Sequence, residues 1–253
     1  MPAAIFIRLA LVEARRGGLA WFAALCLLGG IALGTFVAQV AITESRLLQA
    51  SIVAALLRLA AVFIIAAHVV SSVRREIDER RLELLLALPL ARATQYLARL
   101  AGFVVLGLVL AACFSLPLAL WAPLPAVLAW GVSLACELAL VAAAALFFAM
   151  TLAQLVPALG ATAALYVLAR TIGTIQAIAA GPLAEDSLAH QVASATVNAI
   201  ALILPALDRV TRTEWLLYGP PPAQALGGAL AGCLIYAVLL AAAGLFDFQR
   251  RAL

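Results

Sequence analysis

Long apolar stretches separated by short polar connections dominate the pattern of hydrophobic and polar positions along the chain. A hydrocarbon core about 30 Å thick is crossed by about 20 residues of α-helix. Six stretches meet this requirement: residues 19–43, 52–70, 100–121, 126–149, 157–178 and 224–245. The pattern therefore predicts an all-α integral membrane protein, with six transmembrane helices in one domain comprising residues 1–253.

The first 16 residues form a separate predicted element. Four charged residues interrupt their apolar positions and no cleavage site follows, which argues against a signal peptide. Ile5, Leu9 and Val12 recur at helical spacing. We therefore expect residues 1–16 to form an interfacial helix that lies on the membrane surface.

Composition supports the membrane assignment and excludes several functions. Hydrophobic residues make up 67% of the chain and charged residues 11%, whereas a soluble domain is about half apolar and a quarter charged. This excludes a soluble enzyme and a nucleic-acid-binding module. All 16 basic residues are arginines, so the chain cannot supply the lysine of a Walker A loop or of a Schiff base.

The arginines indicate the orientation, because cytoplasmic segments of membrane proteins carry an excess of basic residues. With the N-terminus in the cytoplasm, eleven arginines lie on the cytoplasmic side and three outside. The cytoplasmic set is Arg8, Arg15, Arg16, Arg74, Arg75, Arg80, Arg81, Arg92, Arg99, Arg250 and Arg251, and the external set is Arg46, Arg209 and Arg212. We therefore expect both termini in the cytoplasm, as an even number of spans requires.

Residues 71–98 form the only long predicted cytoplasmic loop. Val73, Ile77, Leu84 and Leu88 are spaced as one stripe of a helix, charged residues surround this stripe, and Pro89 ends or kinks the helix. A solvated connector is one interpretation. A row of leucines framed by both signs of charge favours the other, in which the helix docks into a groove on a soluble partner.

Residues 179–223 form the longest predicted external segment. It contains a 13-residue apolar run, Ala195–Leu207, which is too short to span a membrane. The run is followed by charged residues and by a break at Gly219–Pro222. A re-entrant or interfacial element and a plain external cap over the spans are both compatible with this pattern.

Three ionisable residues lie within predicted spans. Each of Arg58, Glu137 and Arg170 should have a partner or an aqueous cavity, since a charge at the centre of a bilayer costs about 2.5–3.5 kcal/mol. Glu137 is near the middle of its span and could pair with either arginine. The set is interpreted either as an internal ion pair that fixes helix packing or as part of a substrate pathway.

The sequence predicts no catalytic residues and no metal site. It contains no G-x-S-x-G or H-E-x-x-H motif and no serine, histidine and acidic group on one helix face. The two histidines are far apart. The four cysteines lie in apolar stretches without metal-ligand spacing and are expected to be buried thiols: Cys26, Cys113, Cys136 and Cys233.

Two segments resemble ABC-2 type transporter permeases. After their second span these proteins carry an acidic residue, a leucine-rich turn, a proline, an arginine and a small-residue entry into the third span. The corresponding residues here are Glu79, Leu82, Leu84, Leu85, Pro89, Arg92 and Gly102, with Arg81 where the family often has glycine. The chain end is similar too, with ILPALDRVTRTEWLLYG before the last span and Phe248, Arg250 and Arg251 after it.

The resemblance implies a half-transporter of the type V exporter kind in a bacterial inner membrane, with export as the usual direction. Two permease copies, expected as a homodimer, would form the pathway. Two separate ATPase subunits would bind the loop at 71–98 as a coupling helix and would hold ATP and Mg²⁺, so this chain would carry no cofactor. Residues 179–223 would be an external re-entrant element. The implied ATPase-coupling residues are Ile77, Glu79, Arg80, Leu82, Glu83, Leu84, Leu85, Pro89 and Arg92.

Two other classes of function compete with this one. A self-sufficient secondary transporter or channel should show polar residues on several spans or an internal repeat, and no clear repeat is present. A membrane enzyme would need catalytic residues. Spans rich in Ala, Leu and Val favour either a hydrophobic or amphiphilic cargo or a narrow closed pathway seen from its lipid side. Membrane lipid is an expected partner whereas nucleic acid is not. A periplasmic partner is left open.

Overall fold

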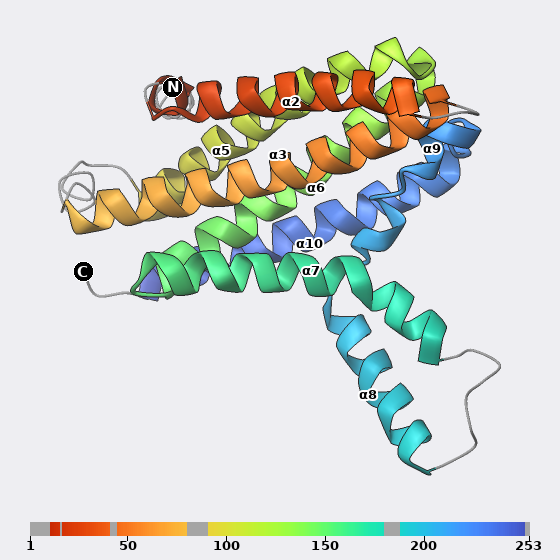
Figure 1. Ribbon diagram of the computed structural model, residues 1–253. Helices are drawn as coiled ribbons and strands as arrows, with labels where there is room; N and C mark the ends of the chain where they lie inside the picture. The colour runs from red at the N-terminus through yellow and green to blue at the C-terminus, as the bar shows by residue number, and fades with distance from the viewer. Residues whose placement is uncertain (1–10, 16, 41–44, 80–90, 180–187, 251–253) are drawn as a thin grey trace.

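The computed structural model describes residues 11–15, 17–40, 45–79, 91–179 and 188–250 (Figure 1). These residues form helices joined by short connections, with no strand among them. Six helices are long and apolar enough to cross a membrane: α2 (Leu19–Val40), α3 (Ser45–Asp78), α5 (Arg92–Ser115), α6 (Leu124–Thr151), α7 (Leu155–Ala179) and α10 (Ala223–Arg250). The all-α prediction is confirmed, and the six helices are consistent with an integral membrane protein.

The helices run back and forth, so the bundle has two distinct ends (Figure 1). Residues 11–15, the end of α3, the start of α5 and the end of α10 lie together at what we call the terminal end. The opposite end carries the 3₁₀ helices η1 (Leu116–Leu120) and η2 (Leu207–Arg209) and the short helix α9 (Glu214–Tyr218), and we call it the cap end.

Two helices extend well beyond their predicted apolar stretches at the terminal end. α3 has 34 residues and is therefore about 51 Å long, which exceeds the thickness of a hydrocarbon core. It continues through the charged residues Arg74–Asp78, whereas the apolar stretch ends at residue 70. The first part of the predicted loop helix, up to Asp78, is therefore an extension of α3, and α5 begins at Arg92, ahead of the apolar stretch 100–121. Residues 80–90 lie outside the described residues.

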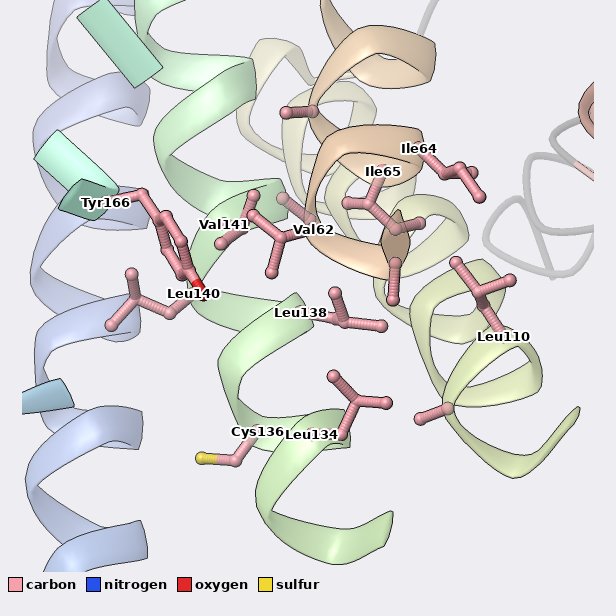
Figure 2. Packing of buried hydrophobic residues seen from close by; sticks show 14 of the residues in the cluster. Val62, Ile64, Ile65, Leu110, Leu134, Cys136, Leu138, Leu140, Val141 and Tyr166 are labelled. Carbon is pink, nitrogen blue, oxygen red and sulfur yellow. The ribbon is translucent and has the colours of Figure 1, made fainter. Parts of the chain in front are cut away.

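α6 is the central helix of the bundle. In its most apolar 18-residue stretch 72% of the residues are buried, and it packs against α3, α5, α7 and α10. Figure 2 shows Leu134 and Leu138 of α6 pointing towards α3 and α5, while Cys136 and Leu140 point to the other side. By contrast, only 11% of the corresponding stretch of α2 is buried, so most of α2 is exposed on the outside of the bundle.

The amino-terminal segment is described only at residues 11–15, which are helical. Ser72 of α3 donates a hydrogen bond to the carboxylate of Glu13 (3.0 Å), and the adjacent Ala14 is buried. The described part of the predicted interfacial helix therefore packs against the terminal end of α3. Residues 1–10 and Arg16 are outside the described residues.

The segment before α10 is a sharply bent pair of helices. α8 (Leu188–Ile203) meets the Leu207–Tyr218 half at an angle of 72°. α8 projects sideways from the bundle, and its Leu202 and Ile203 are 90% and 70% exposed (Figure 1). The second half packs against α3, α6 and α7 and buries Leu207 and Leu216. Because α7 ends and α10 begins at the cap end, the bent pair makes no net crossing (Figure 1).

Gly244 permits the close approach of α10 to α5. A Cβ atom at this position would overlap the hydroxyl oxygen of Tyr96 and lie 3.0 Å from its Cζ atom. The Tyr96 hydroxyl is buried and has no hydrogen-bond partner among the described residues. The contact therefore leaves no room for a larger side chain at position 244, and it gives the Tyr96 hydroxyl no hydrogen bond.

Replacing Gly244 by alanine is expected to destabilise the protein by about 1–3 kcal/mol, the usual cost of overpacking a filled core. Tyr96→Phe removes the oxygen that the new methyl group would meet, so the double variant should regain most of the lost stability. Tyr96→Phe alone should be neutral or stabilising, because it deletes a buried hydroxyl without a partner. Thermal unfolding of the four proteins in detergent measures these differences, and equal losses from Gly244→Ala in both backgrounds would contradict the contact.

Candidate functional site

The three ionisable residues predicted within spans belong to one buried polar network. Arg58 of α3 donates a hydrogen bond from Nη1 to Oε2 of Glu137 on α6, at 2.6 Å. The two side chains are 2% and 0% exposed. Arg58 and Glu137 are therefore partners of each other, and Glu137 forms its ion pair with Arg58 rather than with Arg170.

The guanidinium of Arg58 is held by further groups of α6. Its Nη2 donates to the hydroxyl of Ser133 at 2.9 Å, and Ser133 in turn donates to the backbone carbonyl of Trp130. The guanidinium carbon lies 4.9 Å from the centroid of the Trp130 ring, a cation–π distance. Trp130, Ser133 and Glu137 share one face of α6, so this helix supplies all three of these partners of the arginine.

A tyrosine joins the ion pair to the third ionisable residue. The hydroxyl of Tyr166 on α7 donates to Oε1 of Glu137 at 2.8 Å and accepts a hydrogen bond from Nη1 of Arg170 at 2.6 Å. Both oxygens of Glu137 are thus occupied, one by α3 and one by α7. The network therefore ties three helices together through a single carboxylate.

This arrangement has the features of a structural ion-pair network that fixes helix packing, rather than those of a reactive centre. A buried carboxylate is tolerated only when it is paired and its remaining lone pairs are satisfied, and Glu137 meets both conditions. Two arginines and one glutamate leave the network with a net charge of +1. Neither Arg58 nor Glu137 lines any of the three cavities described in this structure, and the side chains of the pair are almost completely buried.

A second cluster of charges lies at the terminal end, where the coupling residues were predicted. Arg99 of α5 forms an ion pair with Glu76 of α3 at 2.5 Å, and the two side chains are 10% and 18% exposed. Arg74 reaches the backbone carbonyl of Leu152 at the end of α6 (3.3 Å) and pairs with Asp78 one turn along α3. These contacts join α3 to both α5 and α6 close to residues 79–91.

Only three of the predicted coupling residues lie within the described residues. Ile77 packs against the core at the end of α3, Glu79 is exposed in the turn after α3, and Arg92 is exposed at the start of α5. The others lie outside the described residues: Arg80, Leu82, Glu83, Leu84, Leu85 and Pro89.

Sequence reasoning missed three members of the buried network, although helical spacing could have found them. Ser133 precedes Glu137 by four positions and Tyr166 precedes Arg170 by four, so each is one turn from a residue already singled out. Trp130 precedes Glu137 by seven, or two turns. A search for polar or aromatic neighbours at these intervals would have identified the network.

The thiols of Cys136 and Cys233 meet where α6 packs on α10. Cys233 donates to the backbone carbonyl of Cys136, with sulfur and oxygen 3.5 Å apart. In the part of the chain that the structure describes, no group of three or more His, Cys, Asp or Glu side chains could hold a metal ion. Comparison of the chain with known protein families and with curated proteins finds no match.

Proposed function

We propose that the chain is the membrane-spanning subunit of an ATP-binding cassette exporter similar to the ABC-2 type permeases. Two copies would form a homodimer around the pathway, and each would bind one ATPase subunit through the loop between α3 and α5. The distribution of arginines supports a terminal end that faces the bacterial cytoplasm. The bent pair would then be the external re-entrant element, and the ATPase subunits would bind ATP and Mg²⁺.

One observation carries this proposal: the helices on both sides of the loop continue into the bundle and are braced against each other. α3 runs without a break from the charged residues of the terminal end to Arg58, whose ion pair holds α6. The pair Glu76–Arg99 joins α3 to α5 beside the loop. A displacement of the loop would therefore move α3 and α5 together. It would reach α6 through two contacts of α3, the ion pair of Arg58 and the hydrogen bond of Arg74 to the carbonyl of Leu152.

The proposed mechanism follows from these connections. Closure of the ATPase dimer on ATP would push the loop, and the paired ends of α3 and α5 would move as a unit. Because α6 is held by Arg58 and packs against both α7 and α10, it would carry this motion to these two helices. The two permease copies would thereby rock between inward-facing and outward-facing states, which moves an apolar or amphiphilic cargo outward.

Purification of the chain from its native membranes tests the proposed partner. An ATP-binding cassette subunit should copurify in a 1:1 ratio, identified by mass spectrometry. Transport in proteoliposomes should require ATP. Purification without an ATPase, together with transport driven by an ion gradient alone, would instead identify a self-sufficient secondary transporter or channel.

Replacing Glu79 and Leu85 by alanine is expected to abolish the stimulation of ATP hydrolysis by the permease, because both residues lie in the proposed contact with the ATPase. Membrane insertion and the basal hydrolysis of the isolated ATPase should not change. Matched controls are Glu214→Ala and Leu202→Ala, since both of these side chains are exposed away from the terminal end. Full stimulation in the Glu79→Ala/Leu85→Ala variant would refute the coupling assignment.

A further inference from the structure

A large cavity opens at the cap end, between the bent pair and the first half of α10. Its volume is ≈ 660 Å³, within the range of about 300–1,000 Å³ that is typical of small-molecule sites. One wall is formed by Leu204–Leu207 and Trp215, and the other by the face of α10 that carries Gly228, Gly232 and Tyr236. The buried thiol of Cys233 also lines it, so the cavity reaches into the bundle.

Two arginines at this cavity lack a carboxylate partner. Arg209 and Arg212 line the cavity and are exposed, and neither forms an ion pair or side-chain hydrogen bond with another described residue. The neighbouring Asp208 does not neutralise them, because its carboxylate lies against Gly173 of α7. Two guanidinium groups three residues apart are suited to bind one anionic group through several charge-assisted hydrogen bonds.

The interior of the cavity is suited to an apolar chain. Ala225, Gly228, Ala229 and Gly232 occupy positions i, i+3, i+4 and i+7, so they share one face of α10 and form a wall of small side chains along it. A Cβ atom at Gly228 or Gly232 would meet no other atom within 4 Å, so open space runs beside the backbone at both positions. The cavity thus combines a cationic part with an apolar groove that follows the helix.

We propose that this cavity binds an amphiphile with a phosphate headgroup, specifically an anionic phospholipid of the leaflet at the cap end. The phosphate would contact Arg209 and Arg212, and one acyl chain would lie along Gly228 and Gly232. A face of small residues can also receive a helix of a second copy. A twofold pairing through this cavity would bring the same two arginines of each copy together, so we favour the lipid. The proposal goes beyond the proposed transport function and needs no ATPase.

Binding of phosphatidylglycerol to the purified full-length chain, measured by native mass spectrometry in detergent, tests the headgroup contact. The Arg209→Gln/Arg212→Gln variant should bind phosphatidylglycerol at least about tenfold more weakly, because several charge-assisted hydrogen bonds are lost. Its binding of phosphatidylcholine should change much less. Arg46→Gln is the matched control, since Arg46 lies at the same end and does not line the cavity. Equal affinities for phosphatidylglycerol in all three proteins would overturn the proposal.

A second pair of variants tests the apolar groove. Gly228→Leu should fill the space beside α10 and weaken the binding of both lipids, whereas Gly227→Leu, one position away and outside the cavity lining, should not. Inorganic phosphate alone should not displace phosphatidylglycerol, because it lacks the acyl chain. Displacement by inorganic phosphate would reduce the site to a simple anion site. If Gly228→Leu prevents dimer formation but leaves lipid binding unchanged, the cavity is an interface between copies. Displacement by phosphate or this loss of the dimer alone would overturn the proposal.

Discussion

Replacing Arg58 by methionine is expected to destabilise the protein by about 3–5 kcal/mol, one of the two largest effects that the structure predicts. The substitution leaves Glu137 as a buried carboxylate without its ion-pair partner, and the cost of that unpaired charge dominates the loss. Glu137→Leu should be comparably damaging, because it leaves the guanidinium of Arg58 buried and unpaired. Unfolding of purified variants in detergent micelles, followed by tryptophan fluorescence, measures both losses.

The double variant Arg58→Met/Glu137→Leu distinguishes the destabilisation caused by an unpaired buried charge from the net contribution of the ion pair to the free energy of unfolding. Replacement of a buried ion pair by apolar residues of similar volume is often neutral or stabilising, so the double variant should be more stable than either single variant. Tyr166 would keep its hydrogen bond with Arg170. Arg46→Met, at the exposed start of α3, is the control and should change stability by less than about 0.5 kcal/mol. Additive losses in the double variant would show that the two residues do not interact.

The second large effect is expected from Trp130→Ala, which should cost about 3–5 kcal/mol. Trp130 is fully buried and is the largest of the fully buried side chains. Its ring also contacts the guanidinium of Arg58, which adds about 0.5–2 kcal/mol to the packing term. Its Nε1 has no hydrogen-bond partner among the described residues, so no lost hydrogen bond contributes.

Two further tryptophan variants show which property of Trp130 matters. Trp130→Phe keeps an aromatic face beside Arg58 and should lose clearly less stability than Trp130→Ala. Trp21→Ala is the matched control. It removes the same side chain, but Trp21 of α2 is 81% exposed, so no cavity forms inside the bundle. Thermal unfolding of the three variants in detergent gives the comparison. A loss at Trp21 equal to that at Trp130 would show that burial in the bundle is not the cause.

Hydropathy predicted correctly the six helices that are long and apolar enough to span a membrane, because a lipid environment selects strongly for uninterrupted apolar helices. It placed the ends of α3 and α5 less well, since a helix can continue into water once its apolar part is complete. The charged residues Arg74–Asp78 therefore remain helical although they lie beyond the apolar stretch. The apolar run Ala195–Leu207 was recognised as too short to span. Its break follows from a local signal, since α8 ends at Ile203, two residues before Pro205, whereas the 72° angle between the two halves is a property of the tertiary packing.

The partner of Glu137 could not be chosen from depth in the membrane alone. Glu137 was expected near the middle of its span, so either Arg58 or Arg170 could have formed the ion pair. The packing of α3 directly against α6 brings Arg58 to the carboxylate, and Arg170 is linked to the carboxylate only through the hydroxyl of Tyr166. This choice is a property of the helix arrangement and not of any one helix.

The ion pair at the centre of the bundle has a consequence for how the chain is made. Arg58 is synthesised 79 residues before Glu137, so α3 leaves the ribosome while its partner helix does not yet exist. An unpaired arginine at this depth costs about 2.5–3.5 kcal/mol during insertion. The other residues of α3, whose apolar stretch has a mean hydropathy of 2.4, must offset that cost until α6 arrives. The order of synthesis thus requires α3 to be apolar enough to insert with an unpaired arginine, before α6 can supply the partner of that arginine.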